Sequence, residues 1–146
     1  PFRLRIDYVM SLMNWNEILD DILPDEDTED NISNRFVKPL LEALGFSEKD
    51  EQCVQFKTGD GFQKVDFAAR KNNGSDFFHV SRSNPYLLVE VKARAVKSGA
   101  NINRINLLEG TPQYLKTREQ IKRYLLAPNC KTAQWGIITN AVHIQL

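Results

Sequence analysis

The sequence contains no long apolar run, few cysteines and few histidines. No stretch of the 146 residues approaches the roughly 18 consecutive apolar residues that a membrane-spanning helix needs. Cys53 and Cys130 lack metal-ligand spacing and predict reduced, partly buried thiols in a cytoplasmic protein. His79 and His143 are isolated and match neither an HNH nor a zinc pattern. The composition therefore argues against membrane, disulfide-rich and zinc proteins.

Other absences concern domain organisation. The sequence has no G-x-x-x-x-G-K-[ST] motif, so the chain carries no P-loop nucleotide-binding motor of its own. It has no internal repeat, linker or low-complexity segment, and its length fits one domain with a real core. The start at Pro1, with neither Met nor a signal-like pattern, indicates a trimmed or partial chain. We predict one domain over residues 1–146.

The charges are distributed unevenly along the chain. The net charge is zero, which alone argues against a nucleic-acid partner. Between Glu17 and Glu51, twelve residues are acidic and three basic, whereas between Lys92 and Lys131 nine are basic and two acidic. Such an asymmetry can create a positive surface on a neutral protein. The alternative is an ordinary solvated helix face.

Helical spacing of apolar residues appears first in the N-terminal part of the chain. Residues from about 4 to 23 predict one helix or two short ones, ended by Pro24. Asp27 or Thr28 is suited to cap a second helix, which Gly45 ends. Pro39 lies inside this second helix, and we expect it to kink the helix or to be accommodated by tertiary contacts.

Later in the chain, Thr111 as N-cap and Pro112 at the first helical position open a helix that stops before Pro128. A short helix is also predicted from Ile102 to Leu108, after a loop at 97–99.

Alternating and continuous apolar runs predict strands. Residues 54–58 and 62–70 form a hairpin around Gly59-Asp60-Gly61, and in the second strand Val65, Phe67 and Ala69 are expected on one face. Further strands are predicted at Tyr86–Ala93, Gln134–Ile138 and Ala141–Leu146. The fold class is therefore α/β, with a mixed central β-sheet flanked by α-helices.

Glu90 and Lys92 interrupt the apolar strand Tyr86–Ala93. They are two residues apart and project from the same face. Buried charges are costly unless they pair or bind a metal, so the two are either an ion pair at the sheet edge or part of a site. Asp66, an acid in mid-strand, would join them if the two strands are neighbours. Two carboxylates suit Mg²⁺, and a nearby lysine can orient a water molecule and offset charge on a phosphate.

The order of these residues resembles a known family. Asp66 followed by Glu90-Val91-Lys92 is similar to the D…(D/E)xK core of the PD-(D/E)xK nuclease superfamily, which has the restriction-endonuclease-like fold. Four flanking segments look like parts of the N-terminal nuclease domain of type I restriction enzyme R (motor) subunits, in the same order. They are Glu29 with the "PLLxxLG" segment Arg35–Phe46, the strand Lys64–Ala68, the QxxxY helix Gln120–Tyr124 and the strand Gly136–Asn140.

The resemblance implies a role for each matching residue. Asp66 and Glu90 would bind Mg²⁺ or Mn²⁺, with the Val91 carbonyl as a further ligand. Lys92 would be the catalytic lysine. Glu29 would complete the acidic pocket, directly or through water. The nuclease core would cover residues 25–146, after an N-terminal helical extension over 1–24.

The resemblance also implies a nucleic-acid surface on the QxxxY helix. Gln120 and Tyr124 would line the site and contact the DNA backbone, together with Lys122 and Arg123. The alternative for the first two is a capping glutamine and a core tyrosine. The sequence departs from the family pattern at two positions: Val65 stands in place of the proline of "PD", and Ala141 in place of the glycine after Thr-Asn.

The function implied is metal-dependent hydrolysis of DNA phosphodiester bonds by an endonuclease. Motor and specificity subunits of a restriction system are expected partners. Two alternatives stay open at this point. One is a repair or recombination nuclease of the same fold that acts on DNA ends or junctions. The other is a module of this fold that binds DNA or a partner protein without cutting.

Overall fold

The computed structural model describes residues 2–12, 28–58, 61–71, 76–79 and 84–146, and it describes only the backbone of residues 2, 10, 51–58, 61–63 and 129. Part of the predicted N-terminal helical stretch, with Pro24 and Asp27, lies outside the described residues, as does most of the predicted turn at 59–61.

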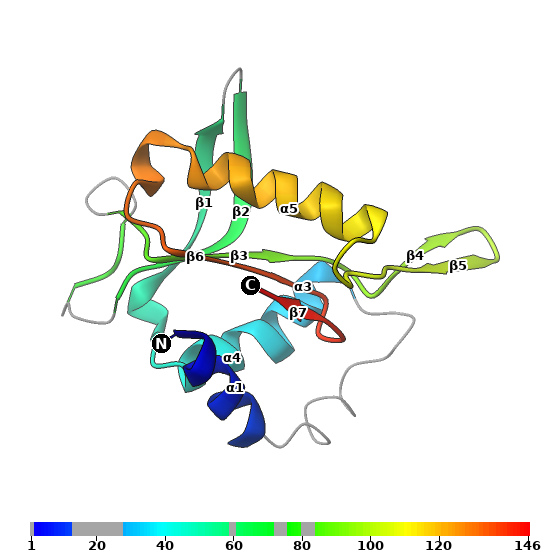
Figure 1. Ribbon diagram of the computed structural model, residues 1–146, viewed down its shortest axis with the longest axis horizontal. Helices are drawn as coiled ribbons and strands as arrows, with labels where there is room; N and C mark the ends of the chain where they lie inside the picture. Colours follow the sequence, from blue (N-terminus) through cyan, green and yellow to red (C-terminus); the bar gives the residue numbers. More distant parts are fainter. Residues whose placement is uncertain (1, 13–27, 59–60, 72–75, 80–83) are drawn as a thin grey trace.

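A mixed five-stranded sheet forms the centre of the protein (Figure 1). The strands lie in the order β1 (Glu51–Thr58), β2 (Gly61–Ala69), β3 (Leu87–Val91), β6 (Trp135–Thr139) and β7 (Ile144–Gln145). β3 and β6 are parallel, and the other neighbouring pairs are antiparallel. The predicted α/β class, the mixed sheet and the hairpin of β1 and β2 are confirmed.

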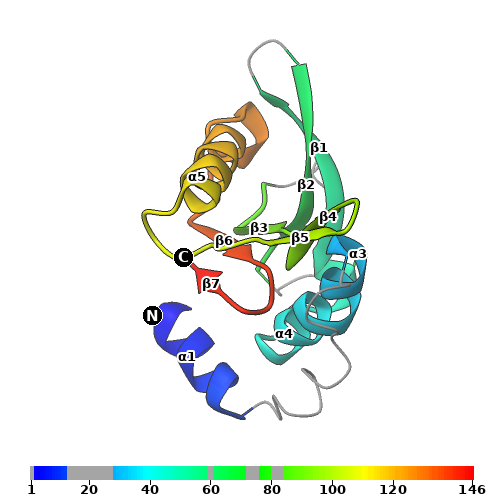
Figure 2. The same cartoon turned by 90° about the vertical axis from the view of Figure 1, so that its right-hand side faces the viewer.

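Helices cover both faces of this sheet. They are α1 (Phe2–Leu12), α3 (Glu29–Ile32), the π-helix η1 (Ser33–Val37), α4 (Lys38–Ala43), α5 (Pro112–Leu125) and the 3-10 turns η2 (Glu48–Asp50) and η3 (Pro128–Cys130). One apolar cluster joins α1, α3 and α4 to one face of the sheet, and a second joins α5 to the other. In Figure 2, β3 and β6 lie between α5 and α3–α4. No described helix is both long and apolar enough to span a membrane.

The second predicted helix is continuous from α3 to α4 and contains a π-helical turn. Thr28 caps it, since its side chain accepts a hydrogen bond from the Asn31 N–H at 3.2 Å. Pro39 follows η1 directly. Because a proline ring clashes with the carbonyl four residues earlier in an α-helix, the wider π turn accommodates it. The helix ends at Gly45, whose φ of 90° favours glycine, as predicted.

The prediction of a helix from Ile102 to Leu108 is wrong. Residues Ala95–Ser98 form β4 and Asn101–Arg104 form β5, and the two pair as an antiparallel hairpin separate from the main sheet. Ser98 pairs with Asn101, and Gly99 has a φ of 60°. A glycine at this position of a two-residue turn is typical of a tight hairpin, and this turn outweighs the weak helical spacing.

The register of β1 and β2 shifts by one residue at Asp66 and Phe67. The pairs on either side of the shift are Gln52 with Ala68 and Val54 with Val65. Two residues of β2, Asp66 and Phe67, therefore lie opposite a single residue of β1, which defines a β-bulge. Bulges bend a strand and re-aim its side chains, and they occur often beside active sites.

The bulge overturns the predicted faces of β2. Val65 and Ala68 pack in the cluster under α5, whereas Phe67 and Ala69 pack in the cluster with α3 and α4. The expectation that Val65 shares a face with Phe67 and Ala69 is wrong, because strict alternation holds only in a strand without an extra residue.

Candidate functional site

β2 and β3 are neighbours, so Asp66 lies beside the end of the strand that carries Glu90. Phe67 pairs with Val89, and the Asp66 carboxylate accepts a hydrogen bond from the Val91 N–H at 2.7 Å through Oδ2. This bond holds the carboxylate against the last residue of β3. The sequence therefore placed Asp66 and Glu90 together correctly.

Glu90 is almost completely buried, and within the described residues only one of its two carboxylate oxygens accepts a hydrogen bond. Its side chain is 3% exposed, and Oε1 accepts a 2.6 Å hydrogen bond from the Lys92 Nζ. The other oxygen, Oε2, is buried and accepts no hydrogen bond from the part of the chain that the structure describes. A buried acceptor without a partner is unfavourable, so this oxygen is suited to a ligand that supplies positive charge.

Both carboxyl groups are held in an environment that opposes ionisation. Burial raises the pKa of Glu90 to about 7, although Lys92 acts in the opposite direction, and the charges of Asp66 and Glu29 add to the rise. Burial also raises the pKa of Asp66, against the effect of the Val91 N–H. A divalent cation reverses such shifts because it favours the ionised carboxylates. The donor set, two carboxylates with one unpartnered oxygen, fits a hard cation such as Mg²⁺.

Glu29 lies in the first turn of α3 and is exposed to solvent. The negative charge of Glu29 contributes to the raised pKa of Glu90, and the charge of the neighbouring Asp30 contributes to the raised pKa of Asp66. Among the described residues, no three His, Cys, Asp or Glu side chains lie close enough together to hold a metal ion. Within the described residues Glu29 forms no such cluster with Asp66 and Glu90, and its contribution to the acidic pocket, directly or through water, stays a prediction.

Gln120 and Tyr124 lie on the face of α5 that covers the site. The Tyr124 hydroxyl donates to the Lys64 carbonyl at 2.7 Å and accepts from the Gln120 Nε2 at 2.8 Å. Tyr124 is fully buried, and burial raises its pKa to about 12, with a contribution from the charges of Glu90 and Asp66. Of the two roles considered for Tyr124, the core role matches this position, since the hydroxyl ties α5 to β2 next to Asp66.

Lys122 and Arg123 lie on the exposed side of α5. The Lys122 Nζ is 3.0 Å from the Glu119 carboxylate, and the Arg123 Nε donates to the Glu119 carbonyl at 3.3 Å. Exposed ion pairs of this kind are weak and are readily exchanged for other anions. Their contact with DNA stays a prediction.

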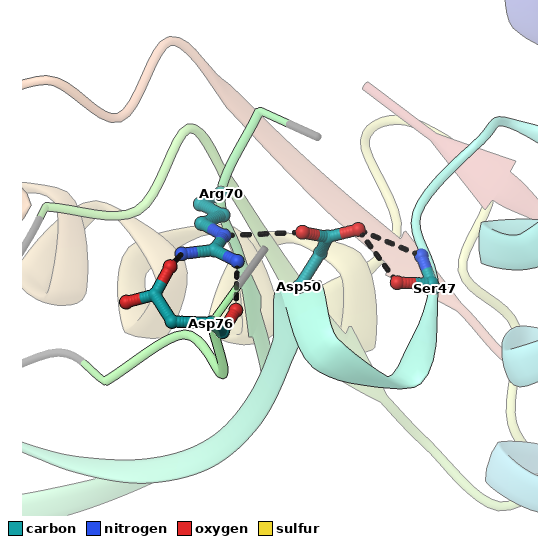
Figure 3. A network of polar contacts seen from close by, with 4 residues as sticks. All are labelled: Ser47, Asp50, Arg70 and Asp76. Carbon is teal, nitrogen blue, oxygen red and sulfur yellow. Dashed lines mark hydrogen bonds and ion pairs between the residues drawn. The ribbon is translucent and has the colours of Figure 1, made fainter. Parts of the chain in front are cut away.

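Sequence reasoning missed a buried ion pair at the opposite end of the sheet (Figure 3). Asp50 is fully buried and receives hydrogen bonds from the Ser47 N–H, the Ser47 hydroxyl and the Arg70 Nε, at 3.0, 2.9 and 3.0 Å. Arg70 also contacts Asp76. Burial acts to raise the pKa of Asp50, but these donors together hold it below its usual value. Ser47, three residues before Asp50, was a usable turn signal in the sequence.

The raised pKa of Glu90 predicts an unusual dependence of stability on pH. Between pH 4.5 and about 7 the folded protein keeps a proton on Glu90 that the unfolded chain has lost, so stability falls as pH rises. The loss should reach about 3 kcal/mol at pH 8. Urea unfolding in EDTA at pH 5 and pH 8 should show it in wild type and not in Glu90→Gln. Glu119→Gln, on an exposed residue, should keep the wild-type slope.

Comparisons of the chain with protein-family models, with curated proteins and with solved structures found no match.

Proposed function

We propose that this chain is a metal-dependent endonuclease that hydrolyses DNA phosphodiester bonds, with the restriction-endonuclease-like fold and a nuclease domain like that of type I restriction R subunits. The observation that carries the proposal is the meeting of Asp66, Glu90 and Lys92 at one end of the sheet, with a buried, unpartnered oxygen on Glu90. The mixed sheet flanked by helices supports the fold assignment.

Asp66 and Glu90 are the residues that would hold the cation, with the Val91 carbonyl as a further ligand. When bound, Mg²⁺ or Mn²⁺ supplies positive charge against the phosphate and makes a water molecule easier to deprotonate. The Val91 N–H fixes one Asp66 oxygen and leaves the other for this purpose. Glu90 offers Oε2 without losing its bond to Lys92.

Lys92 is the group that would act on the water and the phosphate. Its side chain is 22% exposed, so the ammonium group lies at the boundary between the buried Glu90 and solvent. From there it can orient an attacking water molecule and offset the charge that develops on the phosphate. The bond to Glu90 holds Nζ in place and limits the entropy lost when the substrate binds.

DNA is proposed as the substrate because the chain that follows Lys92 is basic. The segment from Lys92 to Lys131 has nine basic and two acidic residues, and Lys122 and Arg123 are exposed within it. Contacts from such residues to phosphates supply most of the sequence-independent affinity for DNA. Motor and specificity subunits remain proposed partners.

Calorimetric titration with Mg²⁺ and with Mn²⁺ tests the proposal without requiring DNA. Wild type should bind the cation, and Asp66→Ala should lose most of this binding, because one of two carboxylate ligands is gone. Asp7→Ala, which removes an exposed carboxylate on α1, is the matched control and should bind like wild type. Binding to Asp66→Ala as tight as to wild type would refute the assignment.

A further inference from the structure

The chain leaves the sheet just after Lys92 as a two-stranded arm, formed by β4 and β5. Figure 1 shows this arm extending away from the sheet and the helices. Every residue from 96 to 104 is exposed, and the two strands pair only with each other. An isolated two-stranded ribbon gains little stability from packing. Its position beside the site therefore suggests that the arm binds a partner.

Hydrogen bonds fix the base of the arm to the end of the sheet that carries the site. The Ile105 N–H donates to the Arg94 carbonyl at 2.8 Å, which closes the hairpin. The fully buried Asn140 donates from Nδ2 to the Ile105 carbonyl at 2.9 Å, and the Lys92 N–H donates to the Thr139 carbonyl at 2.9 Å. The arm and the catalytic lysine are thus held to the same strand end, that of β6.

The charge of the arm and its base is positive throughout. Residues 92–108 include Lys92, Arg94, Lys97 and Arg104 and no acidic residue. The pairing of β4 with β5 places Lys97, Ile102 and Arg104 on one face of the ribbon. The other face carries Val96, Ser98, Asn101 and Asn103. One face is therefore cationic, and the other carries side-chain amides.

The apolar residues of the arm do not form a patch. Val96 and Ile102 are 53% and 48% exposed, and they lie on opposite faces of the ribbon. A protein-docking surface of this size usually has a contiguous apolar centre, which neither face provides. The charge instead complements phosphates.

We propose that the β4–β5 arm enters the major groove of duplex DNA beside the scissile phosphate. The major groove is about 12 Å wide and admits a two-stranded ribbon. The face with Asn101 and Asn103 lies toward the base edges, where side-chain amides can bond to adenine. The long side chains of Lys97 and Arg104 reach the bordering phosphates. This inference rests on the proposed function for its DNA partner and for the position of the cut.

The test is DNA binding in EDTA, where no metal-dependent cleavage occurs. Fluorescence anisotropy with a short duplex compares wild type with the double variant K97A/R104A over a range of salt. The variant should bind on the order of tenfold more weakly, and its slope of log affinity against log salt should be shallower by about two. The charge-conserving variant K97R/R104K should bind like wild type.

R3A/K49A is the matched control, because it removes one exposed arginine and one exposed lysine that lie outside both the arm and the basic segment from Lys92 to Lys131. It should leave the affinity and the salt slope unchanged. Equal effects of the two double variants would overturn the arm proposal, as would a K97A/R104A protein that binds like wild type. N101A/N103A should weaken binding to an A·T-rich duplex more than to a G·C-rich one, and equal losses would overturn the assignment of the inward face.

Failure of the arm proposal and failure of the nuclease proposal are distinguishable. A chain that binds metal through Asp66 but binds DNA equally well without Lys97 and Arg104 keeps the nuclease site and refutes the arm. A chain that binds no metal but loses DNA affinity in K97A/R104A keeps the arm and refutes the nuclease. An arm that instead pairs with a second copy of the chain would give concentration-dependent association without an effect on DNA, which refutes the proposal.

Discussion

Lys92→Ala should abolish metal-dependent cleavage of plasmid DNA while the protein stays folded. Lys92 is the one cation in hydrogen-bond contact with Glu90 within the described residues, and its side chain is partly exposed to solvent. Loss of a group that assists proton transfer and offsets phosphate charge typically lowers the rate by at least about 100-fold. Conversion of supercoiled to nicked and linear plasmid in Mg²⁺ or Mn²⁺ measures this rate.

Two comparisons separate catalysis from folding and metal binding in this experiment. Lys49→Ala removes an exposed lysine outside the site and outside the basic segment from Lys92 to Lys131, and it should cut like wild type. Calorimetry should show that Lys92→Ala still binds the cation, because both carboxylates remain. Undiminished cleavage by Lys92→Ala would show that the lysine is not catalytic. Linear and closed-circular substrates cut at very different rates would favour the repair or recombination nuclease over the restriction type.

Asp50→Ala should destabilise the fold by about 3 kcal/mol, because it leaves the Arg70 guanidinium without its buried partner and removes the acceptor for Ser47. Urea unfolding at pH 7 measures the change. Asp76→Ala removes the exposed partner of Arg70 and should cost no more than about 1 kcal/mol. Similar losses of unfolding free energy in Asp50→Ala and Asp76→Ala would mean that the buried contact of Arg70 with Asp50 stabilises the fold no more than the exposed contact with Asp76.

The Asp50–Arg70 ion pair also predicts how the free energy of unfolding changes at low pH. The pKa of folded Asp50 lies below its usual value of 3.8, so its contribution is complete above that value and is lost as pH falls through the folded pKa. Wild type should therefore lose more stability than Asp50→Ala on acidification below pH 4. The difference in unfolding free energy between wild type and Asp50→Ala should therefore become smaller below pH 4.

The placement of Glu90 and Lys92 on one face could be predicted because it depends on a local pattern. Two residues apart on a strand means the same face, and a buried strand with charges near its end indicates a site. Helix ends at Thr28, Gly45 and Thr111 were also predictable, since capping depends on one or two residues. The adjacency of β2 and β3 was a hypothesis that the structure confirmed.

The features that escaped prediction depend on contacts between distant segments. Nothing in the spacing of residues 62–70 marks an extra residue at Asp66 and Phe67, because a bulge is defined only against the partner strand. The helix predicted over 102–108 failed because the turn at Gly99 and its cross-strand pairing fix β5. The tie between Asn140 and Ile105 joins residues far apart in the sequence.

The bulge also acts as a spacer between the two ends of the β1–β2 hairpin. With the register near the hairpin tip continued unbroken, Asp50 would face Ala69, a residue that cannot form an ion pair. The extra residue brings Arg70 opposite instead, and the Arg70 N–H donates to the Asp50 carbonyl at 2.9 Å. We expect insertions or deletions at the tip to leave the Asp66 carboxylate and the Asp50–Arg70 ion pair unchanged. Deletion of Phe67 would instead shift the Asp66 carboxylate and, at the same time, separate Arg70 from Asp50. The number of residues from Asp66 to Arg70 is therefore fixed, while the length of the hairpin tip is free to vary.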